Sequence, residues 1–384
     1  MRKEVNKRKV SFFLISLFGG GGEIVVLDLA KWFASNGFSV DLLLFTRKGR
    51  IEDKIDKRIN IIDLKSSRII LSIFEIAKYL KKQKPVAILG TSEHANLVLI
   101  TAKLVSFSKT KIFARVGILF SKLFENYKKK RDRLIPFLIR ILYPRADMII
   151  ANSKNVALDL EKISGIPNNK IKVIYNPKFL QEIKIKSQQG EWSYPNKHTI
   201  LAVGRLDGQK HFEILIKAFD GIRKEIDAQL IILGEGGERK KLEKLVKDLE
   251  LKDVYLPGFV QNPYFYMKNA SIIVSTSIHE GFSNVLIEAG ILGLAVIATD
   301  CGSGTRELLA PNSDCTKQLG GDKIDYADNG ILIASGNHKS LSKAMLTLLK
   351  DDELRAGYSK KIKDFSQKFD SDKILQEFKK LFLS

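Results

Sequence analysis

Cysteines and long apolar runs are scarce in this 384-residue chain, and acidic residues are fewer than basic ones. The two cysteines, Cys301 and Cys315, imply no disulfide framework and favour a reducing, cytoplasmic setting. No stretch approaches the ~20 consecutive apolar residues of a membrane-spanning helix, so an integral membrane protein is not expected. The length is too great for a single hydrophobic core and predicts two domains.

The first residues resemble a secretory signal, because residues 1–9 are basic and residues 10–18 are apolar. The apolar run is short, however, and four glycines follow it in place of a small-residue cleavage site. A buried first strand that enters a glycine loop explains these features better than a signal does. We therefore expect residues 9–16 to form the first strand.

Acidic residues are outnumbered, since 64 Lys and Arg accompany 43 Asp and Glu and give a formal net charge of +21. Such a charge favours polyanions such as anionic lipid headgroups, nucleic acid or phosphorylated substrates. Between residues 103 and 145 only Glu125 and Asp132 oppose a cluster of basic residues. The cluster is Lys103, Lys109, Lys111, Arg115, Lys122, Lys128, Lys129, Lys130, Arg131, Arg133, Arg140 and Arg145.

Apolar residues interleave with this basic cluster, which gives the segment an amphipathic character. Segments of this kind dock on anionic membrane surfaces. A solvated helix whose apolar stripe belongs to the core would show the same pattern. Both interpretations remain open for the segment taken alone.

Short aliphatic runs alternate with longer amphipathic ones, the pattern of parallel sheets with crossover helices. The predicted strands are residues 9–16, 39–45, 86–89, 111–115, 147–151, 172–175, 199–203, 229–233, 254–256, 271–275 and 295–298. The predicted helices are residues 23–35, 71–82, 95–107, 120–142, 154–163, 212–224, 238–249, 284–292 and 340–349. This pattern predicts an α/β protein of two Rossmann-like, doubly wound domains, with ligand sites at the carboxyl ends of strands, facing a central cleft.

The helical and strand periodicity is interrupted around Gly190 and Pro195, which indicates a linker. We expect residues 1–183 to form the N-terminal domain, residues 184–197 the linker, and residues 198–362 the C-terminal domain. Residues 363–384 are expected to form a C-terminal helix that can pack back on the N-terminal domain.

Two glutamates, Glu280 and Glu288, stand eight positions apart where a predicted strand is followed by a helix. Glu280 lies in the loop, and Glu288 lies about one turn into the helix. The backbone N–H groups at the helix start suit an anion or sugar hydroxyls. The loop between the glutamates consists of Gly281, Phe282, Ser283 and Asn284. Two glutamates at this spacing are usually surface residues, but the strand–loop–helix setting indicates a binding site.

This segment resembles the Glu-x7-Glu motif of the retaining glycosyltransferases of family 4, which have the GT-B fold. Three further segments resemble the family in the same order: an N-terminal glycine loop, a Gly-Arg-Leu…Lys segment, and the strand and glycine turn after the motif. They are residues 20–23, 204–210 and 296–307. The matches cover nearly the whole chain. The resemblance implies a membrane-facing acceptor domain at the N-terminus and a nucleotide-sugar domain at the C-terminus.

The resemblance also assigns roles to individual residues. Arg205 and Lys210 would bind the donor diphosphate and stabilise charge on the leaving group. If the resemblance is set aside, the alternative is that they are ordinary exposed basic residues of a basic protein. Glu288 would accept hydrogen bonds from the nucleotide ribose, and Glu280 would contact the sugar and stabilise positive charge at the anomeric carbon.

Glycines are expected to bring backbone close to the donor diphosphate from both domains. Gly20, Gly21 and Gly22 lack the Cβ that would hold a phosphate away. Gly302 and Ser303 offer the same geometry from the C-terminal domain, where a purely structural turn is the alternative.

Two residues of the N-terminal domain are tied to the reaction by the resemblance. His94 follows the strand at residues 86–89, where many family members carry a functional histidine, and helix capping or another structural role is the alternative. The family commonly has a second histidine after the next strand. This chain has Arg115 there instead, which can bind an acceptor phosphate.

The resemblance implies a retaining, front-side displacement in which the leaving phosphate takes the proton of the acceptor hydroxyl. No metal or other cofactor is expected, because the one Asp-x-Asp sequence, at Asp370 and Asp372, precedes a predicted helix and suits N-capping. The segment after Asp300 most resembles bacterial enzymes of surface-polysaccharide and glycan-carrier assembly.

We therefore expect transfer of a hexose or N-acetylhexosamine from a nucleotide sugar, with UDP as the nucleotide, to a polyprenyl-linked or other lipid-linked or saccharide acceptor. The expected location is cytoplasmic, peripheral on the inner face of the plasma membrane. One alternative is an epimerase-type enzyme of the same fold acting on nucleotide sugars. Another is a non-catalytic protein that binds anionic membranes or nucleic acid, although no nucleic-acid module is recognised.

Overall fold

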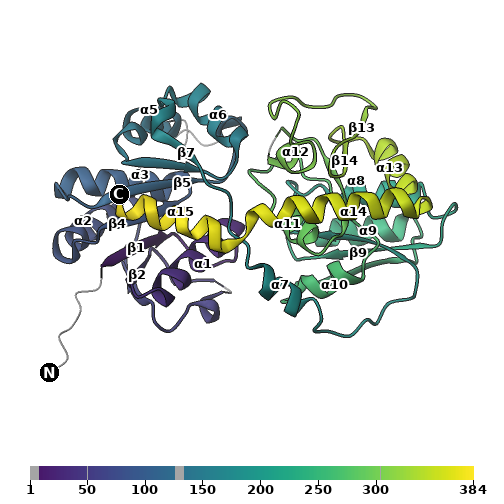
Figure 1. Ribbon diagram of the computed structural model, residues 1–384, viewed down its shortest axis with the longest axis horizontal. Helices are drawn as coiled ribbons and strands as arrows, with labels where there is room; N and C mark the ends of the chain where they lie inside the picture. The colour runs from purple at the N-terminus through teal and green to yellow at the C-terminus, as the bar shows by residue number, and fades with distance from the viewer. Residues whose placement is uncertain (1–7, 50, 126–133, 303) are drawn as a thin grey trace. The chain divides into compact units, whose positions relative to one another are not determined.

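A computed structural model describes residues 8–49, 51–125, 134–302 and 304–384. The chain divides into two compact units, Met1–Pro177 together with Asp372–Ser384, and Lys178–Ser371. Each unit has a seven-stranded sheet with helices packed against it (Figure 1). The predicted α/β class and the two doubly wound, Rossmann-like halves are confirmed.

The sheet of the first unit has the strand order β3-β2-β1-β4-β5-β6-β7, and all of its described pairings are parallel. Its strands are β1 (Lys9–Leu14), β2 (Ser39–Leu44), β3 (Asn60–Asp63), β4 (Ala87–Thr91), β5 (Lys111–Val116), β6 (Met148–Ala151) and β7 (Ile171–Val173). Phe12 and Phe13 of β1 point to opposite faces and are both fully buried, because helices cover both sides. The order reverses between β1 and β4, so the loops after these strands meet at the carboxyl edge.

Helices cover the two faces of this sheet unequally. They are α1 (Gly21–Ser35), α2 (Ser72–Gln83), α3 (Glu93–Ser106), α4 (Phe120–Glu125), α5 (Ile135–Leu142), α6 (Lys154–Ser164) and α15 (Ser371–Leu383). α2, α3, α5 and α6 pack around Phe13 on one face. On the other face the ring of Phe382 in α15 stacks on Phe113 with centroids 4.8 Å apart and on Phe33 of α1 at 5.2 Å. The last helix of the chain therefore completes the core of the first unit (Figure 1).

The sheet of the second unit has the order β10-β9-β8-β11-β12-β14-β13, with β13 antiparallel at one edge. Its strands are β8 (His198–Val203), β9 (Ala228–Leu233), β10 (Val254–Gly258), β11 (Ile272–Ser275), β12 (Ala295–Thr299), β13 (Ile324–Tyr326) and β14 (Ile331–Ile333). Its helices are α7 (Leu180–Lys186), α8 (Phe212–Asp220), α9 (Arg239–Asp248), α10 (Pro263–Asn269), α11 (Asn284–Ile291), α12 (Gly304–Leu309), α13 (His338–Lys350) and α14 (Asp352–Ser366). Here the order reverses between β8 and β11, whose following loops are neighbours.

The observed units divide the chain at points other than the predicted ones. The second unit begins at Lys178, before the predicted boundary at residue 183, and α14 spans the predicted boundary at residue 362. The segment predicted as a linker carries Trp192 and Tyr194, whose rings lie 6.4 Å from Phe265 and 5.0 Å from Tyr255. These aromatic contacts attach the segment to the second unit, which sequence periodicity does not reveal.

Several elements differ from the sequence-based expectation. β3, β13, β14 and α14 were not among the predicted elements. The helix predicted over residues 120–142 corresponds to two described helices, α4 and α5. Five of the basic residues predicted there lie outside the described residues: Lys128, Lys129, Lys130, Arg131 and Arg133. Within the described part of the chain, no helix is both long and apolar enough to cross a membrane.

Candidate active-site residues

Lys210 and Glu280 form an ion pair at the carboxyl edge of the second unit's sheet. Lys210 follows β8 and Glu280 follows β11, which are neighbouring strands. Their side chains are 17% and 13% exposed, and Glu280 also accepts a hydrogen bond from Ser277 Oγ at 2.9 Å. A Cβ on Gly204 would lie 3.0 Å from Cε of Lys210, so the glycine leaves room for the lysine stem. The fold thus joins a cation and an anion in one largely enclosed place.

Arg205 lies in the same loop as Lys210 but is far more accessible, with 69% of its side chain exposed. Its guanidinium lies 3.2 Å from Asp207 Oδ2 and 3.3 Å from Gln209 Oε1. Gln209 in turn donates a hydrogen bond to the backbone carbonyl of His279 at 2.9 Å. The loop after β8 is therefore tied to the loop that carries Glu280, and Arg205 at its surface can reach an anion.

Glu288 lies one turn into α11, as predicted from the motif. Its Oε1 is 2.6 Å from Nζ of Lys178, and the two side chains are 14% and 8% exposed. Sequence analysis did not single out Lys178, because 110 positions separate it from Glu288 and it belongs to none of the matched segments. The predicted ribose-binding carboxylate is thus held by a buried lysine.

The loop before α11 was predicted to bind the donor through residues 281–284, but these residues have different environments. Ser283 is the N-cap of α11, and Asn284 is the first helical residue. Phe282 is buried, with its ring 5.3 Å from that of Phe369, so its side chain belongs to the core. Gly281 accepts a hydrogen bond from the backbone N–H of Gly304 at 2.9 Å. The groups this loop offers to a ligand are therefore the backbone N–H groups at the start of α11.

The glycine turn after β12 is supported by a buried ion pair. Gly302 has φ +62°, which favours glycine, and Ser303 lies outside the described residues. Arg306 and Asp300 are both nearly fully buried and lie 2.5 Å apart. Asp300 also accepts a hydrogen bond from the backbone N–H of Leu319 at 2.8 Å, which holds the following loop. Asp300 and Arg306 lie within the segment that resembles the family, but the sequence did not predict that they pair.

The glycine loop of the first unit forms the N-terminus of α1. Gly20 is the N-cap, and Gly21 and Gly22 lie in the first helical turn. The carboxylate of Glu23 accepts hydrogen bonds from the N–H groups of Gly19 at 2.6 Å and Gly20 at 2.9 Å. The N–H groups of Gly21 and Gly22 have no intrahelical acceptor by helix geometry, so they are the donors available to a ligand.

Arg115 lies at the carboxyl end of β5 and is only 2% exposed. Its guanidinium donates to Thr91 Oγ1 at 3.2 Å and to Asn176 Oδ1 at 2.5 Å, and a Cβ on Gly22 would lie 3.6 Å from its Nη1. Burial lowers the pKa of Arg115 to about 10, because the interior disfavours its charge. No carboxylate among the described residues pairs with it, so it is a buried cation with neutral partners beside the glycine loop.

His94 lies in the first turn of α3, one residue after the helix begins at Glu93. Its side chain is 41% exposed, and its Nδ1 is 2.8 Å from Oε1 of Glu93. Ser92 caps the helix with its hydroxyl, which accepts from the N–H of Ala95 at 3.4 Å. The capping role considered for His94 thus belongs to Ser92, while the imidazole is accessible near the ends of β1 and β4.

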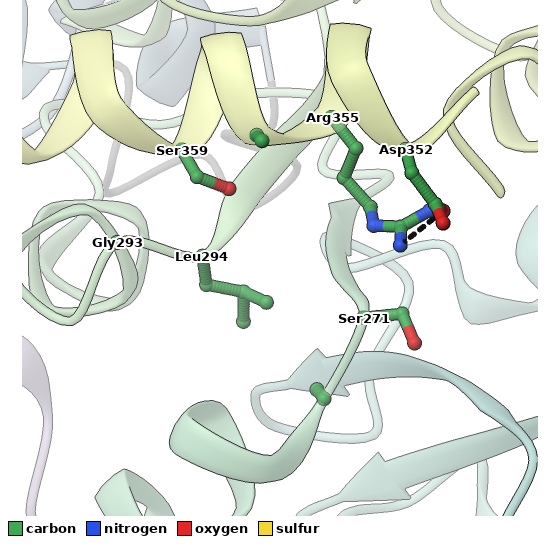
Figure 2. Close-up of a pocket in the computed structure, with 8 residues that line it drawn as sticks. Ser271, Gly293, Leu294, Asp352, Arg355 and Ser359 are labelled. Atoms are coloured by element: carbon green, nitrogen blue, oxygen red, sulfur yellow. Dashed lines mark ion pairs between the residues drawn. The ribbon is translucent and has the colours of Figure 1, made fainter.

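A pocket of about 460 Å³ lies elsewhere in the second unit. Figure 2 shows Ser271, Leu294 and Ser359 around it, with Arg355 paired to Asp352 at 2.6 Å. Ser271 and Leu294 immediately precede β11 and β12, so the pocket lies at the amino edge of the sheet, opposite the predicted residues. Within the described residues, no group of three or more His, Cys, Asp and Glu is arranged to hold a metal ion.

Comparison with known proteins identifies the family of the chain. The family model "Glycosyltransferase Family 4" matches residues 19–177, and the model "Glycosyl transferases group 1" matches residues 184–365. An N-acetylgalactosaminyltransferase of Campylobacter jejuni, named for a saccharide on diphospho-undecaprenol, is 33% identical over 98% of this chain and 100% of its own. The chain belongs to glycosyltransferase family 4.

Further relatives of this glycosyltransferase extend the comparison. A second N-acetylgalactosaminyltransferase of Campylobacter jejuni, named for a diphospho-undecaprenol substrate, is 24% identical over 97% of this chain and 98% of its own. Anabaena HepE, solved with UDP-glucose, superimposes with a TM-score of 0.78 at 21% identity, covering 97% of this chain and 98% of its own. Sucrose-phosphate synthase of Thermosynechococcus elongatus gives a TM-score of 0.80 at 19% identity, covering 98% of both chains. These likenesses confirm the GT-B fold.

Proposed function

We propose that this glycosyltransferase transfers a hexose or N-acetylhexosamine from a UDP-sugar to a lipid-linked saccharide, with retention of configuration. The observation that carries the proposal is the placement of Lys210, Glu280 and Glu288 at one edge of the second sheet. Support for the acceptor comes from the two Campylobacter relatives, whose names specify undecaprenol-diphosphate saccharides. Support for the donor comes from HepE, whose crystal structure contains UDP-glucose.

In the proposed reaction, the second unit binds the donor. Glu288 accepts hydrogen bonds from the ribose hydroxyls, and the N–H groups at the start of α11 lie nearby. Arg205 binds the diphosphate in a bidentate manner, while Lys210 places a point charge against it. Glu280, already paired with Lys210, stabilises the positive charge that develops at the anomeric carbon.

The acceptor hydroxyl attacks the anomeric carbon from the face that the diphosphate leaves. The bond from that carbon to the phosphate oxygen breaks, the new glycosidic bond forms, and the leaving phosphate takes the hydroxyl proton. From the first unit, Gly21 and Gly22 donate N–H groups to phosphate, and His94 lies near the reactive end of the sugar. Arg115 attracts a phosphate of the acceptor. No divalent cation is required, since arginine, lysine and helix N-termini neutralise the diphosphate.

The proposed location is the cytoplasmic face of the plasma membrane, to which the protein binds peripherally. A lipid-linked acceptor is held in the bilayer, so the acceptor-binding unit has to work at its surface. The described basic residues of the first unit, among them Arg140 and Arg145, suit anionic headgroups.

The donor assignment is tested by measuring binding to UDP, GDP, ADP, several UDP-sugars, NAD and a DNA duplex. We expect selective binding of UDP and its sugars, lost in Glu288→Ala and in Arg205→Ala. Glu243→Ala removes an accessible glutamate of α9 and serves as the matched control, with unchanged affinity. Binding of NAD or DNA alone, or UDP binding untouched by both site substitutions, would overturn the donor site.

Retention is tested on the product. A UDP-α-sugar should give an α-linked product, identified by the anomeric coupling constant in the NMR spectrum. A β-linked product would contradict the proposed front-side displacement.

A further inference from the structure

The side chain of Lys178 is an unexplained buried cation in the second unit. Only 7% of the residue is exposed, and its Nζ lies 2.6 Å from Oε1 of Glu288. Among the residues that the structure describes, the ammonium and the carboxylate have no other hydrogen-bond or ion-pair partner. The second oxygen of Glu288, Oε2, is therefore left for a ligand.

Stability alone does not account for this pair. Lysines are almost never buried unless they are paired, and a buried ion pair is often no more stabilising than apolar residues of the same volume. A residue that served only to fill this space would therefore more often be apolar. The pair does, however, fix the orientation of the Glu288 carboxylate.

The backbone of Lys178 is held as firmly as its side chain. Its N–H donates to the carbonyl of Phe369 at 2.8 Å, and its carbonyl accepts from the N–H of Ser371 at 2.9 Å. Phe369 in turn packs against Phe282, in the loop that leads into α11. Lys178, the loop before α11 and the glutamate on α11 thus form one connected assembly within the second unit.

We propose that Lys178 is a positioning residue for donor binding. It holds Oε1 of Glu288 so that Oε2 faces the ribose hydroxyls of the nucleotide. This inference rests on the proposed function, because it assigns the ribose contact to Glu288. The lysine acts through the glutamate and does not itself touch the nucleotide.

The test measures the affinity of the full chain for UMP and UDP by isothermal titration calorimetry. Where a variant binds weakly, its affinity is measured by competition between the two nucleotides. Loss of a charge-assisted hydrogen bond corresponds to a change in affinity of roughly tenfold or more. We expect Lys178→Met to weaken UMP and UDP by the same factor, since both carry the ribose, and Lys178→Arg to retain most of the affinity. Lys186→Met, which removes an exposed lysine of α7 paired with Glu182, is the matched control and should change nothing.

A double substitution separates positioning from general damage to the fold. Lys178→Met leaves the Glu288 carboxylate without its partner and can destabilise the fold. The midpoint of thermal unfolding of this variant is therefore measured together with its UDP affinity. In the background of Glu288→Gln, which has lost the charge that Lys178 holds, a further Lys178→Met should have no added effect on UDP affinity. In turnover assays, Lys178→Met should raise the KM for the donor and leave kcat nearly unchanged, because the ribose contact is the same in ground and transition states.

The outcomes distinguish this inference from the proposed function. If Glu288→Ala abolishes UDP binding but Lys178→Met does not weaken it, the positioning role is wrong while the donor site stands. If the loss in Lys178→Met is much larger for UDP than for UMP, the lysine contacts phosphate directly and the positioning role is again wrong. If Glu288→Ala leaves UDP binding intact, the donor site itself is wrong, and this inference falls with it.

Discussion

At the scale of single residues, each of the two motif glutamates is held by a lysine from a distant part of the chain. Lys210 holds Glu280, and Lys178 holds Glu288. The spacing of the glutamates, the loop between them and Lys210 were all visible in the sequence. The partnership with Lys178 was not, because the two residues meet only when the segment before α7 packs beside α11.

Arg115 is the buried residue to which we assign binding of the acceptor phosphate. It donates to Thr91 and Asn176, yet no described carboxylate neutralises it. We expect Arg115→Met to raise the KM for a polyprenyl-diphosphate saccharide by about tenfold, because a charge-assisted hydrogen bond is lost, and to leave the KM for the donor unchanged. Initial rates at saturating donor, measured by transfer of labelled sugar, check this.

A control distinguishes loss of acceptor binding from damage to the first unit. Arg115→Lys retains the positive charge and should keep part of the acceptor affinity. If both variants raised the donor KM as much as the acceptor KM, an acceptor contact would be contradicted.

At the scale of elements, α5 has apolar side chains on two faces. Ile135 and Ile139 point into the core, while the outward stripe of Leu134, Phe137, Leu138 and Ile141 is between 39% and 62% exposed. The sequence left open whether the apolar residues of this segment face the core or a membrane. In the structure, one face of α5 packs into the core through Ile135 and Ile139, and the other face is exposed. Core packing therefore explains only the first face and leaves the exposed stripe without a role.

The exposed stripe predicts a membrane contact that can be measured. Phe137→Ser combined with Ile141→Ser should reduce binding to phosphatidylglycerol vesicles several-fold in sedimentation assays, because apolar contact area with the acyl region is lost. Phe259→Ser removes a phenylalanine of similar exposure, 59%, from the second unit and should leave vesicle binding unchanged. Equal effects of both changes would mean that the α5 stripe is not a specific docking surface.

A carboxylate connects α8 and α9 and predicts a dependence of stability on pH. Glu213 lies 2.7 Å from Nζ of Lys217 and 2.7 Å from Nζ of Lys241, and hydrogen bonds from these lysines lower the pKa of Glu213 to about 2. A lowered folded-state pKa stabilises the fold above the unfolded pKa, near 4.5, and this stability is lost as the pH falls toward 2.

Glu213→Gln should therefore lower the free energy of unfolding at pH 7 by about 0.5–1 kcal/mol, a value reduced for solvent screening. The difference from wild type should shrink as the pH falls from about 4.5 toward 2, because Glu213 binds a proton in the unfolded chain at a higher pH than in the folded protein. Urea unfolding at pH 7 and pH 3 measures both values. A difference that stayed constant with pH would contradict the assigned role of the two lysines.

At the scale of the whole molecule, residues from the two ends of the chain share one core. Phe12 of β1, Phe33 of α1 and Phe382 of α15 lie within 6.2 Å of one another by ring centroids. The last residues thus belong to the first unit, although the second unit occupies the chain between them.

This arrangement predicts a destabilisation confined to one unit. Phe382→Ala should lower the stability of the first unit by about 3–5 kcal/mol, because a large cavity replaces a stacked ring. UDP binding at a temperature where both units are folded should be unchanged, since Glu288, Arg205 and Lys210 lie in the second unit and the glycine loop of the first unit keeps its fold at that temperature. Thermal unfolding and calorimetry measure the two effects, and Lys380→Ala, an exposed change in the same helix, is the control. Loss of UDP affinity in Phe382→Ala would show that the units are energetically coupled.

Periodicity and loop motifs are local features, so the amino-acid sequence predicted the α/β class, the two doubly wound halves and the family. It also identified Glu280, Glu288, Arg205, Lys210, the glycine loops, His94 and Arg115 as candidates, since each lies in or beside a segment that resembles the family. The structure alone revealed that Lys178 is buried against Glu288 and that Phe282 belongs to the core. These are contacts between segments far apart in the chain, and local propensity carries no information about which distant side chain fills a given space.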